Sequence, residues 1–145
     1  ALVSAIELGI AMQLTNIARD VIEDNVRNRK YIDYDFIKIK ETIELADLFY
    51  KSSFKSIKEI PISCRFAILV ARRIYRQIGY EIVKKKDFEE YKRCGKIFVS
   101  NTKKVIQTFL SIYDFILLIF SKKNNRTNYL RDYEISKEID LNERF

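Results

Sequence analysis

Histidine is absent from this 145-residue chain, and cysteine occurs only at Cys64 and Cys94. Without histidine, the sequence contains none of the common zinc-ligand sets and no histidine-based acid–base pair or catalytic triad. Two isolated cysteines form no ligand pattern and are typical of reduced thiols in a cytosolic protein.

Proline and glycine are also scarce, with one and three residues respectively. No segment alternates apolar and polar residues for long enough to indicate a β-sheet, whereas several segments have helical periodicity. We therefore expect an all-α fold, with helices over about residues 1–27, 37–58, 61–83 and 88–120. Asp33 and Asp35 precede the second helix and can cap it, and the last helix could kink at Gly95.

The charge balance is basic, with 27 Lys and Arg against 20 Asp and Glu and a net charge of +7. Such a balance suits a polyanionic partner. The basic residues are scattered in short runs and no nucleic-acid-binding motif is present, so we expect no nucleic-acid partner. A diphosphate substrate or an anionic membrane surface explains the charge at least as well.

Acids and amides between residues 13 and 24 form the most informative stretch. Asn16, Asp20 and Asp24 recur every fourth residue, which places them along one helix face with Cβ atoms ~5–6 Å apart. Gln13 lies one turn earlier on the same side. Carboxylate and amide oxygens are the ligands that Mg²⁺ prefers, usually bridging one or two carboxylates to substrate phosphates. The spacing thus predicts a Mg²⁺ site formed by Asn16, Asp20 and Asp24.

Spacing leaves a simpler interpretation open. Asp20 and Asp24 could be surface acids that pair with Arg19, Arg27 or Arg29, as most charged residues on helices do. The apolar residues that surround the acidic face favour the metal site, because a solvated helix face would normally mix Lys and Glu.

The string Gln-Leu-Thr-Asn-Ile-Ala-Arg-Asp-Val-Ile-Glu-Asp at residues 13–24 resembles the second aspartate-rich motif of the squalene/phytoene synthase family. Similar segments follow in the family's order over about residues 1–106; they are 28–33, 46–50, 60–79 and 96–104. The sequence of residues 75–79, Tyr-Arg-Gln-Ile-Gly, looks most like that of a bacterial phytoene synthase. Asn28 and Asp33 depart from the family's Gly and Pro, which puts the turn after the motif in question.

The resemblance implies a class I isoprenoid (terpenoid) synthase helical bundle. It also implies a prenyltransferase that uses Mg²⁺, for which Mn²⁺ could substitute. The implied reaction is the head-to-head condensation of two geranylgeranyl diphosphates to phytoene, through a cyclopropyl diphosphate, in carotenoid biosynthesis. Two alternatives stay open: a squalene or dehydrosqualene synthase acting on farnesyl diphosphate, with or without NADPH, and a non-catalytic family member acting as an assembly partner.

Residue roles follow from the matched positions. Asp20 and Asp24 are expected to be catalytic as metal ligands, with Asn16 beside them, and Tyr75 to reach the leaving group. The remaining matched residues are expected to bind the substrate diphosphate by charge, amide or hydroxyl; they are Gln13, Asn16, Arg19, Arg29, Tyr31 and Lys96. Lys96 falls where the family often has Arg, and a point charge still suits a phosphate.

The resembled family needs a domain about twice this length, whose first aspartate-rich motif lies in the N-terminal half. We therefore expect residues 1–120 to represent the C-terminal half of such a domain, from a partial or split gene, with 121–145 as a polar tail. The missing half would be the chain's first partner, and the 145 residues without it should be inactive.

Residues 105–120 are strongly apolar but shorter than the ~20 residues that span a bilayer. They are expected to form either a buried C-terminal helix or a helix that lies on a membrane surface, with Lys122, Lys123 and Arg126 at the headgroups. The second interpretation predicts a cytoplasmic protein that associates peripherally with membrane.

Overall fold

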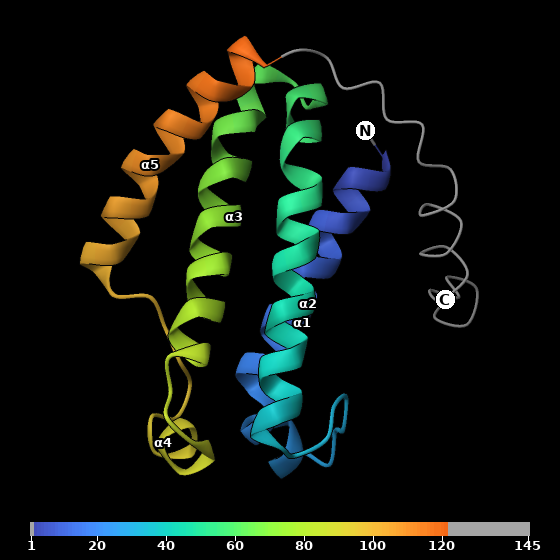
Figure 1. Cartoon of the computed structure of the whole chain (residues 1–145), viewed down its shortest axis with the longest axis vertical. Helices are drawn as coiled ribbons and strands as arrows, with labels where there is room; N and C mark the ends of the chain where they lie inside the picture. Colours follow the sequence, from blue (N-terminus) through green and yellow to red (C-terminus); the bar gives the residue numbers. More distant parts are fainter. Residues whose placement is uncertain (1, 122–145) are drawn as a thin grey trace.

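The computed structural model describes residues 2–121, which form α-helices and one 3₁₀ helix and contain no strand (Figure 1). The all-α expectation is confirmed. The helices are α1 (Leu2–Val26), α2 (Phe36–Ser53), the 3₁₀ helix η1 (Phe54–Glu59), α3 (Ile62–Val83), α4 (Phe88–Arg93) and α5 (Asn101–Phe120). The expected tail from residue 122 onward, with Lys122, Lys123 and Arg126, lies outside the described residues.

Helices α1, α2 and α3 pack against one another, and α5 lies along α3 and η1. In Figure 1, α3 stands between α2 and α5, and α1 runs behind α2. Three groups of buried apolar side chains fill the interfaces. The largest joins α1, α2 and α3 to α4 and the segment before α5; its buried members are Ala18, Val21, Ile39, Ile43, Ile78, Ile82, Tyr91, Ile97 and Val99.

Asp35 begins α2 as the sequence predicts, because its side chain accepts a hydrogen bond from the Ile37 amide at 3.1 Å. The helix is shorter than expected. It ends at Ser53 and tightens into η1, so that residues 54–59 form a 3₁₀ turn rather than the last α-helical turn. Pro61 then precedes α3, which spans almost the expected residues.

A single helix over residues 88–120 is wrong. Gly95 adopts a left-handed conformation with φ of 58°, and its amide donates to the Lys92 carbonyl at 3.1 Å, which ends α4. Glycine tolerates this conformation because it has no Cβ. The chain then runs without helix to Ser100, which caps α5, and it buries Ile97 and Val99 in the core.

Helix α5 turns its polar side inward. Its buried residues are Ser111, Asp114 and Leu118, whereas most of its large apolar residues are exposed. The first of the two interpretations of residues 105–120, a buried C-terminal helix, is therefore wrong for this structure. Among the described residues, no helix is long and apolar enough to cross a membrane.

Candidate functional site

The chain reverses direction at the C-terminal end of α1, beside Asp24. Asn28 has a φ of 55°, the Asn28 amide donates to the Asn25 carbonyl at 3.1 Å, and the Arg29 amide donates to the Asp24 carbonyl at 2.8 Å. This pair of bonds around a left-handed residue is the Schellman ending of a helix. Asparagine is one of the few residues other than glycine that adopts this conformation readily. Asn28, which stands where the resembled family has Gly, therefore still forms a tight turn at this position.

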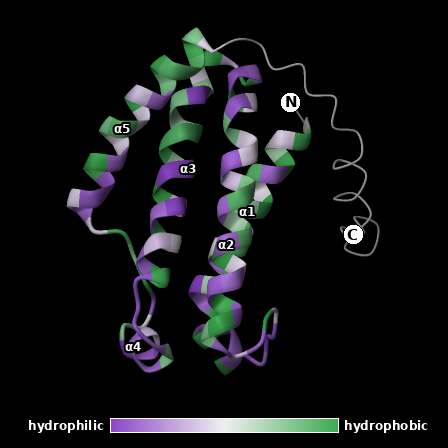
Figure 2. Ribbon diagram, viewed as in Figure 1, coloured by the Kyte–Doolittle hydropathy of each residue, from purple (hydrophilic) through white to green (hydrophobic). Residues whose placement is uncertain are grey.

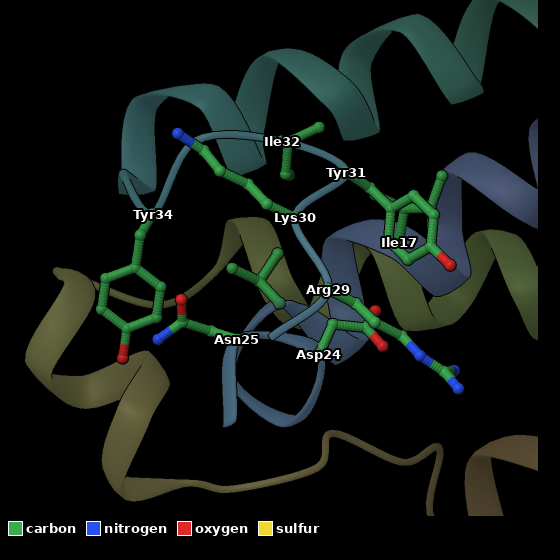
Figure 3. A pocket seen from close by; sticks show the side chains of 9 residues that line it. Ile17, Asp24, Asn25, Arg29, Lys30, Tyr31, Ile32 and Tyr34 are labelled. Atoms are coloured by element: carbon green, nitrogen blue, oxygen red, sulfur yellow. The ribbon is translucent and has the colours of Figure 1, made fainter. Parts of the chain in front are cut away.

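The reversed chain closes a cavity of about 140 Å³ against the last turns of α1. Three residues with predicted site roles, Asp24, Arg29 and Tyr31, line it together. Figure 3 shows Asp24 between two groups, with Tyr34 and Asn25 at one end of the cavity and Tyr31 and Ile17 at the other. The full lining is Ile17, Val21, Asp24, Asn25, Arg29, Lys30, Tyr31, Ile32 and Tyr34.

Asp20 opens into a neighbouring hollow of about 170 Å³, which Arg19, Glu23 and Lys96 also line. The Arg19 guanidinium donates to both Asp20 carboxylate oxygens, each at 2.9 Å. The Lys96 ammonium comes from the segment between α4 and α5 and lies 3.3 Å from Asp20 Oδ1 and 3.1 Å from Glu23 Oε2. The fold thus brings two predicted phosphate-binding cations onto one predicted metal ligand.

Electrostatics favour the charged forms of these groups. Burial tends to raise the pKa of Asp20, but the hydrogen bonds and charges of Arg19 and Lys96 outweigh burial and hold that pKa below its usual range. The hydrogen bond to Asp20 likewise raises the pKa of Arg19, and the hydrogen bond to Glu23 raises that of Lys96. The hollow therefore holds fixed positive and negative charges at neutral pH.

The other predicted residues lie around these two hollows without lining them. Asn16 is half-buried, and its Oδ1 atom is buried without a hydrogen-bond partner among the described residues. Tyr75, half-buried on α3, packs against the core next to α1. Gln13 is exposed, one turn before Asn16.

Sequence analysis did not single out Tyr91, which fixes the position of Arg19. Its side chain is fully buried, and its hydroxyl donates to the Ala18 carbonyl at 2.7 Å and the Arg19 carbonyl at 3.0 Å. Tyr34 was missed as well, although it lines the cavity beside Asp24. The only sequence signal for either residue was an aromatic side chain in a polar segment, which is too common to be specific.

The oxygen atoms on this face suit a hard divalent ion. Residues 2–121 contain no group of three or more His, Cys, Asp or Glu side chains that could hold a metal. Mg²⁺, however, usually binds through one or two carboxylates and completes its shell with phosphates and water. Asp24, whose carboxylate makes no ion pair within the described part of the chain, and the unpartnered Asn16 Oδ1 fit that requirement. Asp20 would have to release Arg19 and Lys96 to join them.

An all-α bundle with an acid-rich helix end facing cationic loops is the architecture of an isoprenoid synthase-like fold. Curated proteins of one family are similar to this chain. A 15-cis-phytoene synthase from a Paracoccus species is 36% identical over 98 residues, covering 55% of this chain and 32% of the relative. A phytoene synthase of Pseudescherichia vulneris is 31% identical over 99 residues, covering 54% and 32%. A chloroplastic phytoene synthase of an Oncidium hybrid cultivar is 32% identical over 124 residues, covering 71% and 29%.

The chain is therefore related to the squalene/phytoene synthase family through its phytoene synthase members. It spans about a third of the length of the curated relatives that it matches. No family model matches the chain. No solved structure matches it either.

Proposed function

We propose that this chain contributes to a Mg²⁺-dependent prenyltransferase of the phytoene synthase type, which joins two geranylgeranyl diphosphates head to head. The observation that carries the proposal is the convergence at the end of α1. Asp20 and Asp24 meet cations from three places: α1 itself, the 27–35 loop and the 94–100 segment. The relationship to phytoene synthases supports the same reaction.

Departure of a diphosphate leaves negative charge that must be held while an allylic cation forms. Preorganised cations and hydrogen-bond donors stabilise such developing charge strongly when water is excluded. Arg19, Arg29 and Lys96 would bind the phosphate oxygens, and the hydroxyls of Tyr31 and Tyr75 would donate to them. Mg²⁺ held by Asp20, Asp24 and Asn16 would neutralise the rest of the leaving-group charge.

The ion pairs around Asp20 suggest how the substrate enters. Arg19 and Lys96 hold the Asp20 carboxylate at 2.9 and 3.3 Å. A diphosphate carries more negative charge than one carboxylate, so both cations would exchange Asp20 for phosphate oxygens. The exchange would leave the Asp20 carboxylate available to hold a metal ion. Each cation would keep an anionic partner throughout.

The test is product analysis on the protein as the cell makes it, supplied with Mg²⁺ and geranylgeranyl diphosphate. We expect phytoene, and expect Asp20→Asn and Asp24→Asn each to reduce turnover on the order of 10³-fold, because each removes part of the metal-bound leaving-group site. Glu44→Gln, on the exposed side of α2, is the matched control and should keep wild-type turnover.

Three results would contradict the proposal. Turnover at the wild-type rate in both aspartate variants would exclude the metal site. A product made from farnesyl diphosphate in preference would identify the squalene or dehydrosqualene type instead. Absence of any turnover, together with absence of Mg²⁺–pyrophosphate binding by calorimetry, would favour the non-catalytic alternative.

A further inference from the structure

Helix α4 is short and mostly charged. Its six residues, Phe88–Arg93, comprise two aromatic side chains and four charged ones, and their hydrophilic character is visible in Figure 2. A helix shorter than about 12 residues is only marginally stable by itself in water, so contacts with the rest of the protein must hold it. Phe88 and Tyr91 are the side chains best able to attach α4 to the bundle.

Tyr91 makes the more specific of these two attachments. Its side chain is fully buried, and its hydroxyl donates to the Ala18 carbonyl at 2.7 Å and the Arg19 carbonyl at 3.0 Å. Its ring lies between Phe88 and Phe36, with 6.0 Å between the ring centroids in each pair. The two carbonyls belong to the 25-residue helix α1, whose own hydrogen bonds already hold them in place. Of the two helices that the hydroxyl joins, α4 therefore depends on it more.

Lys96 follows this attachment closely in the chain. Only four residues separate it from Tyr91, and one of them, Gly95, makes the left-handed turn that ends α4. The Lys96 side chain is 39% exposed, and its ammonium lies 3.3 Å from Asp20 Oδ1. The next residue, Ile97, is buried in the core. The backbone of Lys96 is thus held between two buried side chains, Tyr91 and Ile97, while its own side chain is largely solvated.

We propose that Tyr91 is a positioning residue of the diphosphate site, whose hydroxyl holds Lys96 where its ammonium can bind a phosphate oxygen. This inference rests on the proposed function, which assigns that role to Lys96. A cation that is already held in place loses little freedom when phosphate binds, whereas a mobile one must be ordered by the ligand. Burial and the charge of Asp20 raise the pKa of Tyr91, so its hydroxyl keeps its proton and remains a donor.

The ring of Tyr91 makes a separate contribution. Phe88, on which it stacks, meets Tyr34 edge to face with 4.7 Å between the ring centroids, and Tyr34 lines the cavity beside Asp24. The ring therefore supports the 27–35 loop, while the hydroxyl attaches α4 to α1. A variant that removes the hydroxyl and keeps the ring separates the two contributions.

Tyr91→Phe is that variant, and the measurement is calorimetric titration of the protein as the cell makes it with inorganic pyrophosphate in the presence of Mg²⁺. We expect the dissociation constant to rise about 3- to 10-fold, because the ligand must then order Lys96 itself. Ser111→Ala is the matched control. It removes a buried hydroxyl that donates to a helix carbonyl at 2.8 Å, but no residue of α5 lines either hollow, so it should bind like wild type.

A double-mutant cycle tests whether Tyr91 acts through Lys96. Lys96→Met removes the ammonium and keeps most of the apolar stem. In that background, Tyr91→Phe should weaken pyrophosphate binding much less than it does in wild type, because the cation that it positions is already absent. A purely structural role would instead lower the free energy of unfolding and leave the affinity of the folded protein unchanged. Far-UV circular dichroism and chemical denaturation check that every variant is folded during the titration.

Two results would overturn this inference alone. If wild type binds pyrophosphate and Tyr91→Phe binds it equally well, the hydroxyl does not position the site. If Tyr91→Phe weakens binding by the same factor in wild type and in Lys96→Met, the hydroxyl acts without Lys96. Wild-type protein that binds no pyrophosphate with Mg²⁺ would contradict the proposed function itself and this inference with it.

Discussion

Asn28 performs the role that glycine commonly has at the end of a helix. Its φ of 55° allows the Arg29 amide to reach the Asp24 carbonyl, and this turn places Arg29 and Tyr31 beside Asp24. The backbone conformation of Asn28 therefore determines where Arg29 and Tyr31 lie in the candidate site.

Replacing Asn28 should separate backbone strain from side-chain chemistry. Asn28→Ala should lower the free energy of unfolding by about 1 kcal/mol, because a Cβ without a compensating polar group is strained at positive φ. Asn28→Gly should be neutral or slightly stabilising, since glycine has no such strain. Chemical denaturation of both variants measures the difference. Equal losses in the two would show that the asparagine side chain, not the backbone, holds the turn.

Asp20 should make stability depend on pH. Its folded-state pKa lies below the ordinary 3.8 of the unfolded chain, so folding favours the ionised carboxylate. Its contribution is fully present above the unfolded value and is lost as the pH falls through the lower folded value. The free energy of unfolding of Asp20→Asn should therefore be below that of wild type at pH 7, and the gap should shrink below about pH 4.

Denaturation curves between pH 7 and 3 test this dependence, with Glu44→Gln as the control for loss of one exposed carboxylate. A gap between wild type and Asp20→Asn that stays constant over the whole range would mean that Arg19 and Lys96 do not stabilise the ionised form.

At the scale of elements, α5 depends on one carboxylate. Asp114 is the counter-charge for Arg73 at 2.6 Å and lies 4.0 Å from Arg72. Burial lowers the pKa of Arg72 to about 10, which still leaves the guanidinium protonated at neutral pH. Arg72 also donates to the Tyr50 carbonyl at 2.7 and 3.0 Å, so the same group joins α2, α3 and α5.

Asp114→Ala should thus destabilise the protein by about 3 kcal/mol or more, because removal of one partner leaves buried positive charge uncompensated. Asp33→Ala breaks an ion pair of the same type with Lys30, at 2.9 Å, whose side chains are 64% and 72% exposed. That control should change stability far less than Asp114→Ala, since water and salt screen exposed pairs. Thermal or denaturant unfolding of the two variants gives the comparison. Equal costs would mean that the α3–α5 network is not a buried one in solution.

At the scale of the whole molecule, the candidate site joins segments that are far apart in sequence. Lys96 reaches Asp20 across 76 positions, and Tyr91 hydrogen bonds to the backbone beside it. A ligand that met both Asp20 and Asp24 would touch the 94–100 segment and the 27–35 loop at the same time.

Amide hydrogen exchange should show whether the 27–35 loop and the 94–100 segment bind the same ligand. Addition of Mg²⁺ and inorganic pyrophosphate should slow amide exchange in residues 27–35 and 94–100 together, because both segments would then share one ligand. Exchange in the second half of α5 should not change, since no residue of α5 lines either hollow. Protection of only one segment, or none, would contradict a shared diphosphate site.

Much of the fold could be predicted from local patterns. The acidic helix, the cap at Asp35 and the start of α3 after Pro61 depend on residues near in sequence, so periodicity and capping rules suffice. The helix expected over 88–120 failed because apolar residues continue through Ile97 and Val99. Those side chains are buried by an extended segment, and periodicity does not distinguish that from a helix.

The sequence by itself determined the composition of the candidate site. The i, i+4 repeat of Asn16, Asp20 and Asp24 places three oxygen-bearing side chains along one face of any helix they form, whatever surrounds it. Only tertiary structure decided which charges those acids meet. Asp20 pairs with Lys96 and Asp24 shares a cavity with Tyr31 because loops return to the same helix end. Tertiary structure also decided the orientation of α5. A 3.6-residue pattern defines an apolar side and a polar side, but the ion pairs of Asp114 with Arg72 and Arg73 of α3 determine that the polar side faces inward.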